Sequence, residues 1–241
     1  MSPKTGAILR IIAIILVGLT AAFTLLGGVG TTCVAFNAEK YGRAFAMFVS
    51  YKPTYQLFVY VSLAAGIAGL AAAFAMLRGY KWAYWGAIII VLVSLAVAAV
   101  HMYYSSTLKG VSFFATPPEN MRFYASVITL LFLLLLRLPG IWQWANFTLP
   151  WRGRGSASAA GGLTAFVAGV ITITTPLWAG APHMLDGYNL VNVLQVPLTV
   201  VGWGLVLAGL SLLVLASLGV SGEQMVWAIR RRACPALQAE R

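Results

Sequence analysis

The sequence predicts an all-α integral membrane protein, a bundle of six transmembrane helices with both termini inside and a short amphipathic outer interfacial helix. Composition is the first reason, because 61% of the 241 residues are hydrophobic and 9% are charged, against roughly 25% charged residues in soluble domains. The mean hydropathy of +0.88 agrees with this. The second reason is that six apolar stretches approach the length of about 20 residues that crosses a bilayer core. The distribution of basic residues is the third.

Basic residues divide unevenly between the segments that join these stretches. If the N-terminus is inside, eleven of the sixteen Lys and Arg residues lie on the inner side. The outer segments carry the other five, which are Lys40, Arg43, Lys52, Lys109 and Arg122. Cytoplasmic loops of membrane proteins are enriched in Lys and Arg. We therefore expect both termini in the cytoplasm and the chain in the cytoplasmic membrane.

The expected spans are residues 8–26, 55–76, 82–102, 121–138, 163–178 and 193–218. The first span follows basic residues, as the core of a signal peptide does. It is longer than the roughly 7 to 15 apolar residues of such a core, so we expect a retained helix. Spans two and three are joined by a few residues only, so they should be antiparallel neighbours.

The first outer segment, residues 27–54, is too long for a plain turn. Within it, residues 41–51 are aromatic and apolar but too few to span a bilayer. Asn37 can cap a helix at its start, and Pro53 can open span two because a first-turn proline loses no hydrogen bond. We expect residues 41–51 to form the amphipathic helix on the outer leaflet.

Close packing of membrane helices depends on small residues, which let two backbones approach. Five spans carry such residues four positions apart: Gly18 with Ala22, Ala65 with Gly69 and Ala73, Ser94 with Ala98, Ala165 with Gly169, and Gly204 with Ala208. Span four differs, because residues 130–136 include nothing smaller than Leu. We expect it to face lipid or a partner subunit, so that replacing Leu133 by Ala has little effect. Arg122 and Arg137 would then reach the two membrane interfaces.

The segment after span four suggests how the chain is divided. Residues 152–162 are rich in Gly, Ser and Ala and contain two Arg residues, a composition typical of a flexible linker. The sequence therefore predicts a four-helix membrane unit (1–151), a flexible basic linker (152–162), a two-helix membrane unit (163–220) and a cytoplasmic basic tail (221–241).

Several classes of function are disfavoured by what the sequence lacks. It contains no zinc-protease, nucleophile-elbow or nucleotide-binding motif, so an enzyme is the less expected outcome. Its basic residues flank apolar runs instead of forming a stripe with aromatic residues, so no nucleic acid is expected as a partner. No ionisable residue lies in the middle of an expected span, whereas pumps and ion-coupled transporters commonly bury one there.

Residues 177–189 form the one polar segment between spans that carries no Lys or Arg. It contains His183 and Asp186, and on the expected topology Cys33 and His101 lie at the same outer boundary. Neutral imidazoles bind metals or haem iron, so His101, His183, Cys33 and Asp186 are the candidate ligands of a metal ion or a haem. The alternative is that each is an interfacial polar residue bonded to loop backbone or water, with no cofactor bound.

Three functional hypotheses follow from these observations. The favoured one is a non-catalytic integral membrane subunit or scaffold, which packs against other membrane subunits or further copies of itself within the lipid bilayer. The second is a small redox or metal-binding or haem-binding membrane protein that uses the outer histidines. The third is a small channel or transporter, whose pathway Thr172, Thr174 and Thr175 could line.

Overall fold

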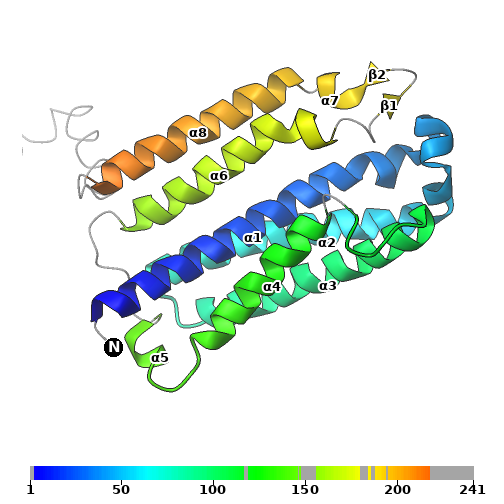
Figure 1. Ribbon diagram of the computed structural model, residues 1–241. Helices are drawn as coiled ribbons and strands as arrows, with labels where there is room; N and C mark the ends of the chain where they lie inside the picture. Colours follow the sequence, from blue (N-terminus) through cyan, green and yellow to red (C-terminus); the bar gives the residue numbers. More distant parts are fainter. Residues whose placement is uncertain are drawn as a thin grey trace, which may run out of the picture.

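Long helices that alternate in direction make up the described part of the chain, as Figure 1 shows for the computed structural model. The structure describes residues 3–116, 119–145, 147, 156–179, 184–185, 188–193 and 195–217. The long helices are α1 (Pro3–Asn37), α2 (Lys52–Arg78), α3 (Ala83–Lys109), α4 (Glu119–Leu135), α6 (Ser156–Ala179) and α8 (Gln195–Ser217). The short elements are the 3₁₀ helices η1 (Ala38–Ala44) and η2 (Ala46–Tyr51), helices α5 (Trp142–Ala145) and α7 (Leu190–Val193), and strands β1 (Met184–Leu185) and β2 (Tyr188–Asn189).

In the part of the chain that the structure describes, five helical segments are long and apolar enough to cross a membrane. They are Ile8–Tyr41, Ala46–Arg78, Ala83–Lys109, Ser158–Leu177 and Gln195–Ser217. The chain is therefore a multi-pass membrane protein, as its composition predicts. The remaining expected span, 121–138, corresponds to α4, which has 17 residues and is about 26 Å long at 1.5 Å per residue.

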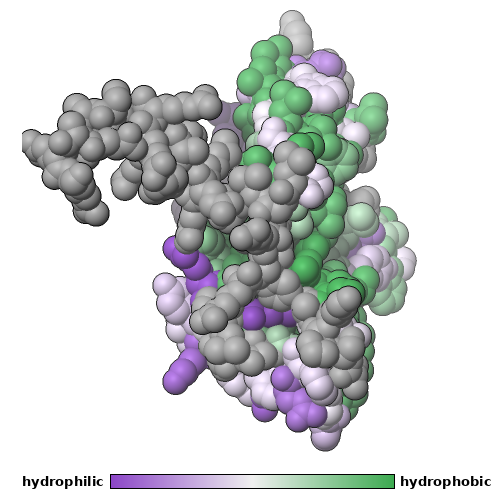
Figure 2. All heavy atoms as spheres, turned by 90° about the vertical axis from the view of Figure 1, so that its left-hand side faces the viewer, coloured by the Kyte–Doolittle hydropathy of each residue, from purple (hydrophilic) through white to green (hydrophobic). Residues whose placement is uncertain are grey.

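The start of α1, the turn between α2 and α3, and helix α5 lie together at one end of the bundle (Figure 1). We call this end the α5 end, and the opposite one, which carries η1 and η2, the η end. Figure 2 faces the α5 end, where hydrophilic residues gather low in the view and hydrophobic residues are prominent toward α6 and α8. Helix α8 also ends there, so the first long helix begins and the last one finishes on the same side.

Helices α1 and α2 pack closely because glycines of α2 lie directly against α1. A Cβ atom added at Gly69 would lie 2.7 Å from the Cβ atom of Ala21, closer than such atoms approach. This contact confirms the role that the sequence suggests for Gly69. A hydrogen bond joins the same two helices near the α5 end, where Nη2 of the buried Arg10 donates to the carbonyl of Met76 at 2.7 Å.

Helices α6 and α8 form an antiparallel pair through two glycine contacts. A Cβ atom at Gly169 would lie 2.7 Å from the carbonyl oxygen of Gly202, and one at Gly162 would lie 2.9 Å from that of Gly209. Gly204, which was also predicted to take part in helix packing, does not do so in the described part of the chain, where no residue lies within 4 Å of a Cβ atom added there. The glycines in contact are seven residues apart, which is two helical turns on one face.

The first outer segment differs from its prediction. Helix α1 continues through residues 27–37, which were expected to be loop, and residues 41–51 form parts of η1 and η2 instead of one α-helix. The glycines at the start of this stretch stay helical because they pack: a Cβ atom at Gly28 would lie 3.0 Å from that of Ser62. The aromatic side chains of Tyr41, Phe45 and Phe48 are buried in a cluster with Tyr55, so they do not face a lipid leaflet.

The prediction that the leucine-rich part of span four faces lipid or a partner is wrong for two of its residues. Leu133 has no exposed surface and Leu136 only 2%. The hydroxyl of Tyr84 in α3 donates to the carbonyl of Leu133 at 2.6 Å, which ties the two helices together. Only the outward residues of the stretch, such as Leu131 and Leu134, are exposed.

The structure also describes part of the predicted linker, residues 152–162, and part of the polar segment 177–189. Helix α6 begins at Ser156, so residues 156–162 of the predicted flexible linker are helical. Strands β1 and β2 pair antiparallel, with Leu185 opposite Tyr188. Residues 186 and 187, which join the two strands, lie outside the described ones.

Candidate functional site

Helix α4 turns a polar face toward the interior of the bundle. Its buried residues are Glu119, Arg122, Ser126, Thr129 and Leu133, which follow one another at alternating spacings of three and four and so share one helical face. Its outward face is apolar and exposed. In this helix the hydrophilic residues are therefore inside, where they meet α1, α2 and α3.

Arg122 is the largest of the fully buried side chains, with 1% of its surface exposed. Its Nη1 atom donates to Oγ of Ser62 in α2 at 2.7 Å, and its Nη2 atom lies 3.2 Å from Nδ1 of His101 in α3. The guanidinium also lies against α1, because a Cβ atom at Gly27 would be 3.4 Å from Nη1. Four helices thus meet around one cation, and Gly27 makes room for it.

The contact with Arg122 assigns the tautomer of His101. A guanidinium has no acceptor, so Nδ1 of His101 has to accept the hydrogen bond, and the proton of a neutral ring then resides on Nε2. Nε2 lies 3.5 Å from Oε1 of Glu119. The imidazole, 2% exposed, is thus placed between a permanent cation and a carboxyl group.

The cluster retains unused hydrogen-bonding capacity. Among the described residues, Oε2 of Glu119 and Nε of Arg122 have no hydrogen-bond partner although both atoms are buried. Buried polar atoms in proteins are normally satisfied by protein or by ordered water. The arrangement therefore offers one free acceptor and one free donor to a water molecule, a proton carrier or a small polar ligand.

Aromatic side chains enclose the imidazole on its other sides. The ring of Phe58 stacks on His101 with centroids 4.8 Å apart, and the ring of Tyr55 meets it edge-on at 5.1 Å. The hydroxyl of Tyr55 is 3.0 Å from Oγ of Ser105. These contacts fix the orientation of the ring and exclude lipid from it.

The cluster lies well inside the bundle. Ser62 is ten residues from the first residue of α2, and His101 is eight from the last residue of α3, which corresponds to about 15 Å and about 12 Å from the η end. Arg122 is near the start of α4 but still lies deep, because the chain after α3 turns back along the bundle before α4 begins (Figure 1). The side chain of Arg122 therefore turns into the bundle, whereas the sequence suggested that it extends toward a membrane interface.

Hydroxyl groups continue the polar face of α4 toward the α5 end. Oγ of Ser126 donates to the carbonyl of Arg122 at 2.9 Å, and the hydroxyls of Thr129 and Thr20 are 2.7 Å apart. Thr24 donates to the carbonyl of Thr20, one turn away in α1. Beyond Thr129 the inward face of α4 becomes apolar at Leu133.

The residues predicted as metal or haem ligands are only partly described. His101 is in the cluster, Cys33 is a half-buried free thiol in α1, and His183 and Asp186 lie outside the described residues. No three His, Cys, Asp or Glu side chains of the described part gather as metal ligands would. The metal or haem site stays a prediction, which a visible absorption spectrum and metal analysis of the purified protein would test.

The polar cluster was missed at the level of sequence, although a signal for it was present. Glu119 lies just before the apolar run of span four, and Arg122, at the second position of that span, was expected to reach a membrane interface. Their spacing to Ser126 and Thr129 continues directly into that run, and polar residues at intervals of three and four mark one face of a helix. The threonines that were considered for a pathway, Thr172, Thr174 and Thr175, instead donate to carbonyls of their own helix.

Comparison with protein-family models, with curated proteins and with solved structures finds no significant match to this chain. A fold alone does not determine function, which depends on the chemistry and geometry of a site. The cluster of His101, Glu119 and Arg122 is the candidate site of this chain.

Proposed function

We propose that this chain is a six-span protein of the cytoplasmic membrane, with both termini in the cytoplasm, and that it transports protons along the inward face of α4. One observation carries the proposal: α4 buries Glu119, Arg122, Ser126 and Thr129 while it exposes its apolar residues. Ionisable side chains are costly inside a membrane, and those that persist there mark substrate pathways or proton relays. Serine and threonine are common where membrane helices pack, but a helix that served packing alone would not bury a carboxyl group and a guanidinium.

The groups of the cluster have distinct chemical roles in this proposal. Glu119 and His101 exchange protons, since a carboxyl group and an imidazole each have a protonated and a deprotonated form. Arg122 stays charged and holds the imidazole in one tautomer through Nδ1. A proton from the η end reaches Glu119 first. It can pass to Nε2 of His101, 3.5 Å away, only when that nitrogen carries no proton, which requires the other tautomer of the ring, protonated at Nδ1. Protonation of the ring at Nδ1 requires the contact with Arg122 to break.

The hydroxyls of Ser126, Thr129 and Thr20 extend the pathway, and the layer of Leu133 and Leu136 closes it. Both leucines are fully or almost fully buried, so this conformation is closed toward the α5 end. Transport then requires a movement that opens the leucine layer, whereas proton exchange at Glu119 and His101 does not.

Proton flux into liposomes that contain the purified protein tests the proposal. With a potassium diffusion potential set by valinomycin and a pH-sensitive dye trapped inside, we expect acidification faster than in protein-free liposomes. The substitution Glu119→Gln should lower the flux by about tenfold or more, because an amide neither binds nor releases a proton. His101→Gln should act in the same direction.

Glu39→Gln is the matched control. Glu39 is an exposed acid near the η end, paired with Lys52 at 2.6 Å, and it has no contact with the cluster. This variant should keep the flux of the unmodified protein. Flux equal to that of empty liposomes, or an equal loss in Glu39→Gln and Glu119→Gln, would contradict the proposal.

A second candidate, the membrane subunit or scaffold expected from the sequence, is favoured by the exposure of the α6 and α8 pair. In α8, Val196, Leu207 and Trp203 are each more than half exposed. Such a surface suits a partner protein in the membrane as well as lipid. A photo-crosslinking residue at Leu207 should then give a discrete protein adduct in native membranes, and one at Leu131, on the exposed face of α4, should not.

A further inference from the structure

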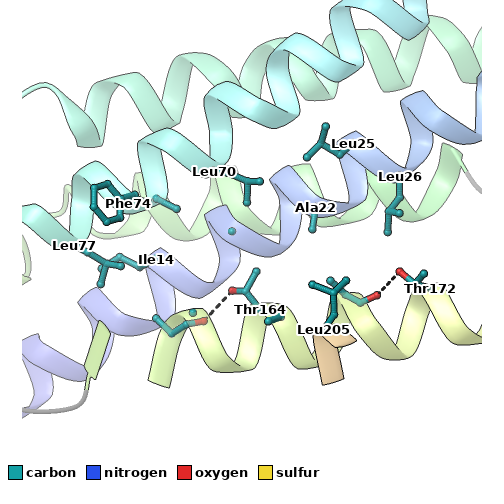
Figure 3. A pocket seen from close by; sticks show the side chains of 16 residues that line it. Ile14, Ala22, Leu25, Leu26, Leu70, Phe74, Leu77, Thr164, Thr172 and Leu205 are labelled. Carbon is teal, nitrogen blue, oxygen red and sulfur yellow. Dashed lines mark hydrogen bonds between the residues drawn. The ribbon is translucent and has the colours of Figure 1, made fainter. Parts of the chain in front are cut away.

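A groove of about 450 Å³ runs between α1 and α2 on one side and α6 on the other, with Leu205 of α8 at its edge. Figure 3 shows its lining residues from these helices, among them Ile14 and Leu26 of α1, Leu70 of α2 and Thr164 of α6. The α1 residues from 14 to 26 extend over about 18 Å at 1.5 Å per residue. The groove is formed by membrane-spanning helices and lies apart from the polar cluster.

The groove has almost no polar surface to offer a ligand. Its two threonines turn their hydroxyls back on their own helix: Thr164 donates to the carbonyl of Ala160 at 2.9 Å, and Thr172 to that of Ala168 at 2.8 Å (Figure 3). Every other lining side chain is apolar, or the residue is glycine. A molecule that fills the groove therefore has to be hydrocarbon along its buried length, since a polar group there would lack a partner.

The size of the groove favours a hydrocarbon chain over a helix. A helix about 10 Å wide encloses roughly 1,400 Å³ over 18 Å of its length, so only a part of it could enter the groove. At roughly 30 Å³ for each water-sized group, the groove holds about fifteen methylene groups. This is the size of one lipid acyl chain.

A positive charge lies at the α5 end of the groove. Phe74 lines the groove, and the guanidinium carbon of Arg78, one turn further along α2, is 5.4 Å from the centre of its ring. Basic side chains at the end of a membrane helix attract anionic headgroups. We propose that the groove binds one acyl chain of an anionic phospholipid, whose phosphate is held near Arg78.

Native mass spectrometry of delipidated protein in detergent tests this proposal. Phosphatidylglycerol and phosphatidylcholine with identical chains serve as the two probes, added at equal concentration. We expect one lipid to bind more tightly than the rest, with preference for phosphatidylglycerol. Arg78→Gln should reduce that preference by about fivefold, the effect of one basic residue near a headgroup.

Two variants that fill the groove test the position of the chain. Ala22→Phe and Ala165→Phe each place an aromatic ring in the groove, the first from α1 and the second from α6. Each should abolish the tight binding of one lipid. The matched control is Ala208→Phe, which adds the same ring to an exposed position of α8. Circular dichroism and size-exclusion chromatography show whether each variant keeps its helices and its monodispersity.

Several outcomes would overturn the proposal. If both groove variants fold and still bind one lipid tightly, the acyl chain binds elsewhere on the protein. Equal loss of lipid in Ala208→Phe would show that binding depends on the general surface. An unchanged preference for phosphatidylglycerol in Arg78→Gln would exclude the proposed contact between Arg78 and an anionic headgroup. A change of oligomeric state in the groove variants without loss of lipid would assign the groove to a second copy of the chain.

Discussion

Arg122 connects α4 to three other helices through a single side chain. Its guanidinium donates to Ser62, contacts His101 and lies against the backbone of α1 at Gly27. An uncompensated charge in such a place costs several kcal/mol, so the polar partners and the space at Gly27 are needed together. The same residue therefore couples the stability of the bundle to the chemistry of the candidate site.

Arg122→Gln should destabilise the protein by about 3 kcal/mol, because the buried groups that remain lose their charged partner. The free energy of unfolding, measured by denaturant titration in mixed micelles, checks this value. Arg43→Gln, at an exposed position, should change the unfolding free energy by less than about 0.5 kcal/mol. Equal stability of the two variants would show that Arg122 has no structural role.

Leu133→Ala should destabilise the protein by about 2 kcal/mol, at the low end of the range for a buried leucine, because it leaves a cavity between α4 and α3. This expectation replaces the one that the sequence alone suggests. Leu134→Ala is the control, since Leu134 is 48% exposed on the same helix. The same titration compares the two variants, and equal losses would contradict the packing of α4.

At the scale of single elements, the register of a glycine on its helix decides whether it takes part in packing. Gly202 and Gly204 are two residues apart on α8, yet only Gly202 faces α6, where a Cβ atom would lie 3.1 Å from the carbonyl oxygen of Gly169. Membrane helices associate by van der Waals packing, so close backbone approach matters more than the apolar character of the surface. The α6 and α8 pair depends on that approach at both of its glycine contacts.

Gly202→Leu should therefore separate α6 from α8, whereas Gly204→Leu should be tolerated. Both substitutions add the same side chain to the same helix, so they differ only in the face that carries it. Thermal aggregation followed by size-exclusion chromatography should show a lower midpoint for Gly202→Leu alone. Equal behaviour of the two variants would mean that the face assigned to the contact is wrong.

At the scale of the whole molecule, α4 determines how many times the chain crosses the membrane. Its 17 residues are near the lower limit for a span, and the polar face lowers its average hydropathy. In Figure 1 it nevertheless runs beside α1 and α3 toward the α5 end. The proposed topology with both termini inside requires α4 to cross.

Labelling of single cysteines decides this point. With the native cysteines replaced by serine, Val111→Cys before α4 and Pro139→Cys after it, both at exposed positions, should react from opposite sides of sealed membranes. Val111→Cys should react with an impermeant maleimide in intact cells, and Pro139→Cys only after permeabilisation. Reaction of both from one side would mean that α4 does not cross and that the chain has five spans.

Composition and hydropathy along the chain were enough to predict a multi-pass, all-helical membrane protein and the approximate position of each long helix. This succeeds because a bilayer imposes a length and an apolar character on every spanning segment. The same reasoning correctly assigned Gly69 to a helix contact. These properties depend on single segments and on the solvent around them.

The tertiary structure decided which residues of each helix face inward, and with them the candidate site. In a soluble protein the apolar face of a helix is the buried one, but lipid is as apolar as leucine, so hydrophobicity does not distinguish the two faces of a membrane helix. Leu133 faces inward and Leu134 outward although the residues are identical, and Glu119 and Arg122 meet His101 only because the chain turns back before α4. Those contacts join residues about 20 to 60 positions apart in the chain, and only packing of the helices against one another brings them together.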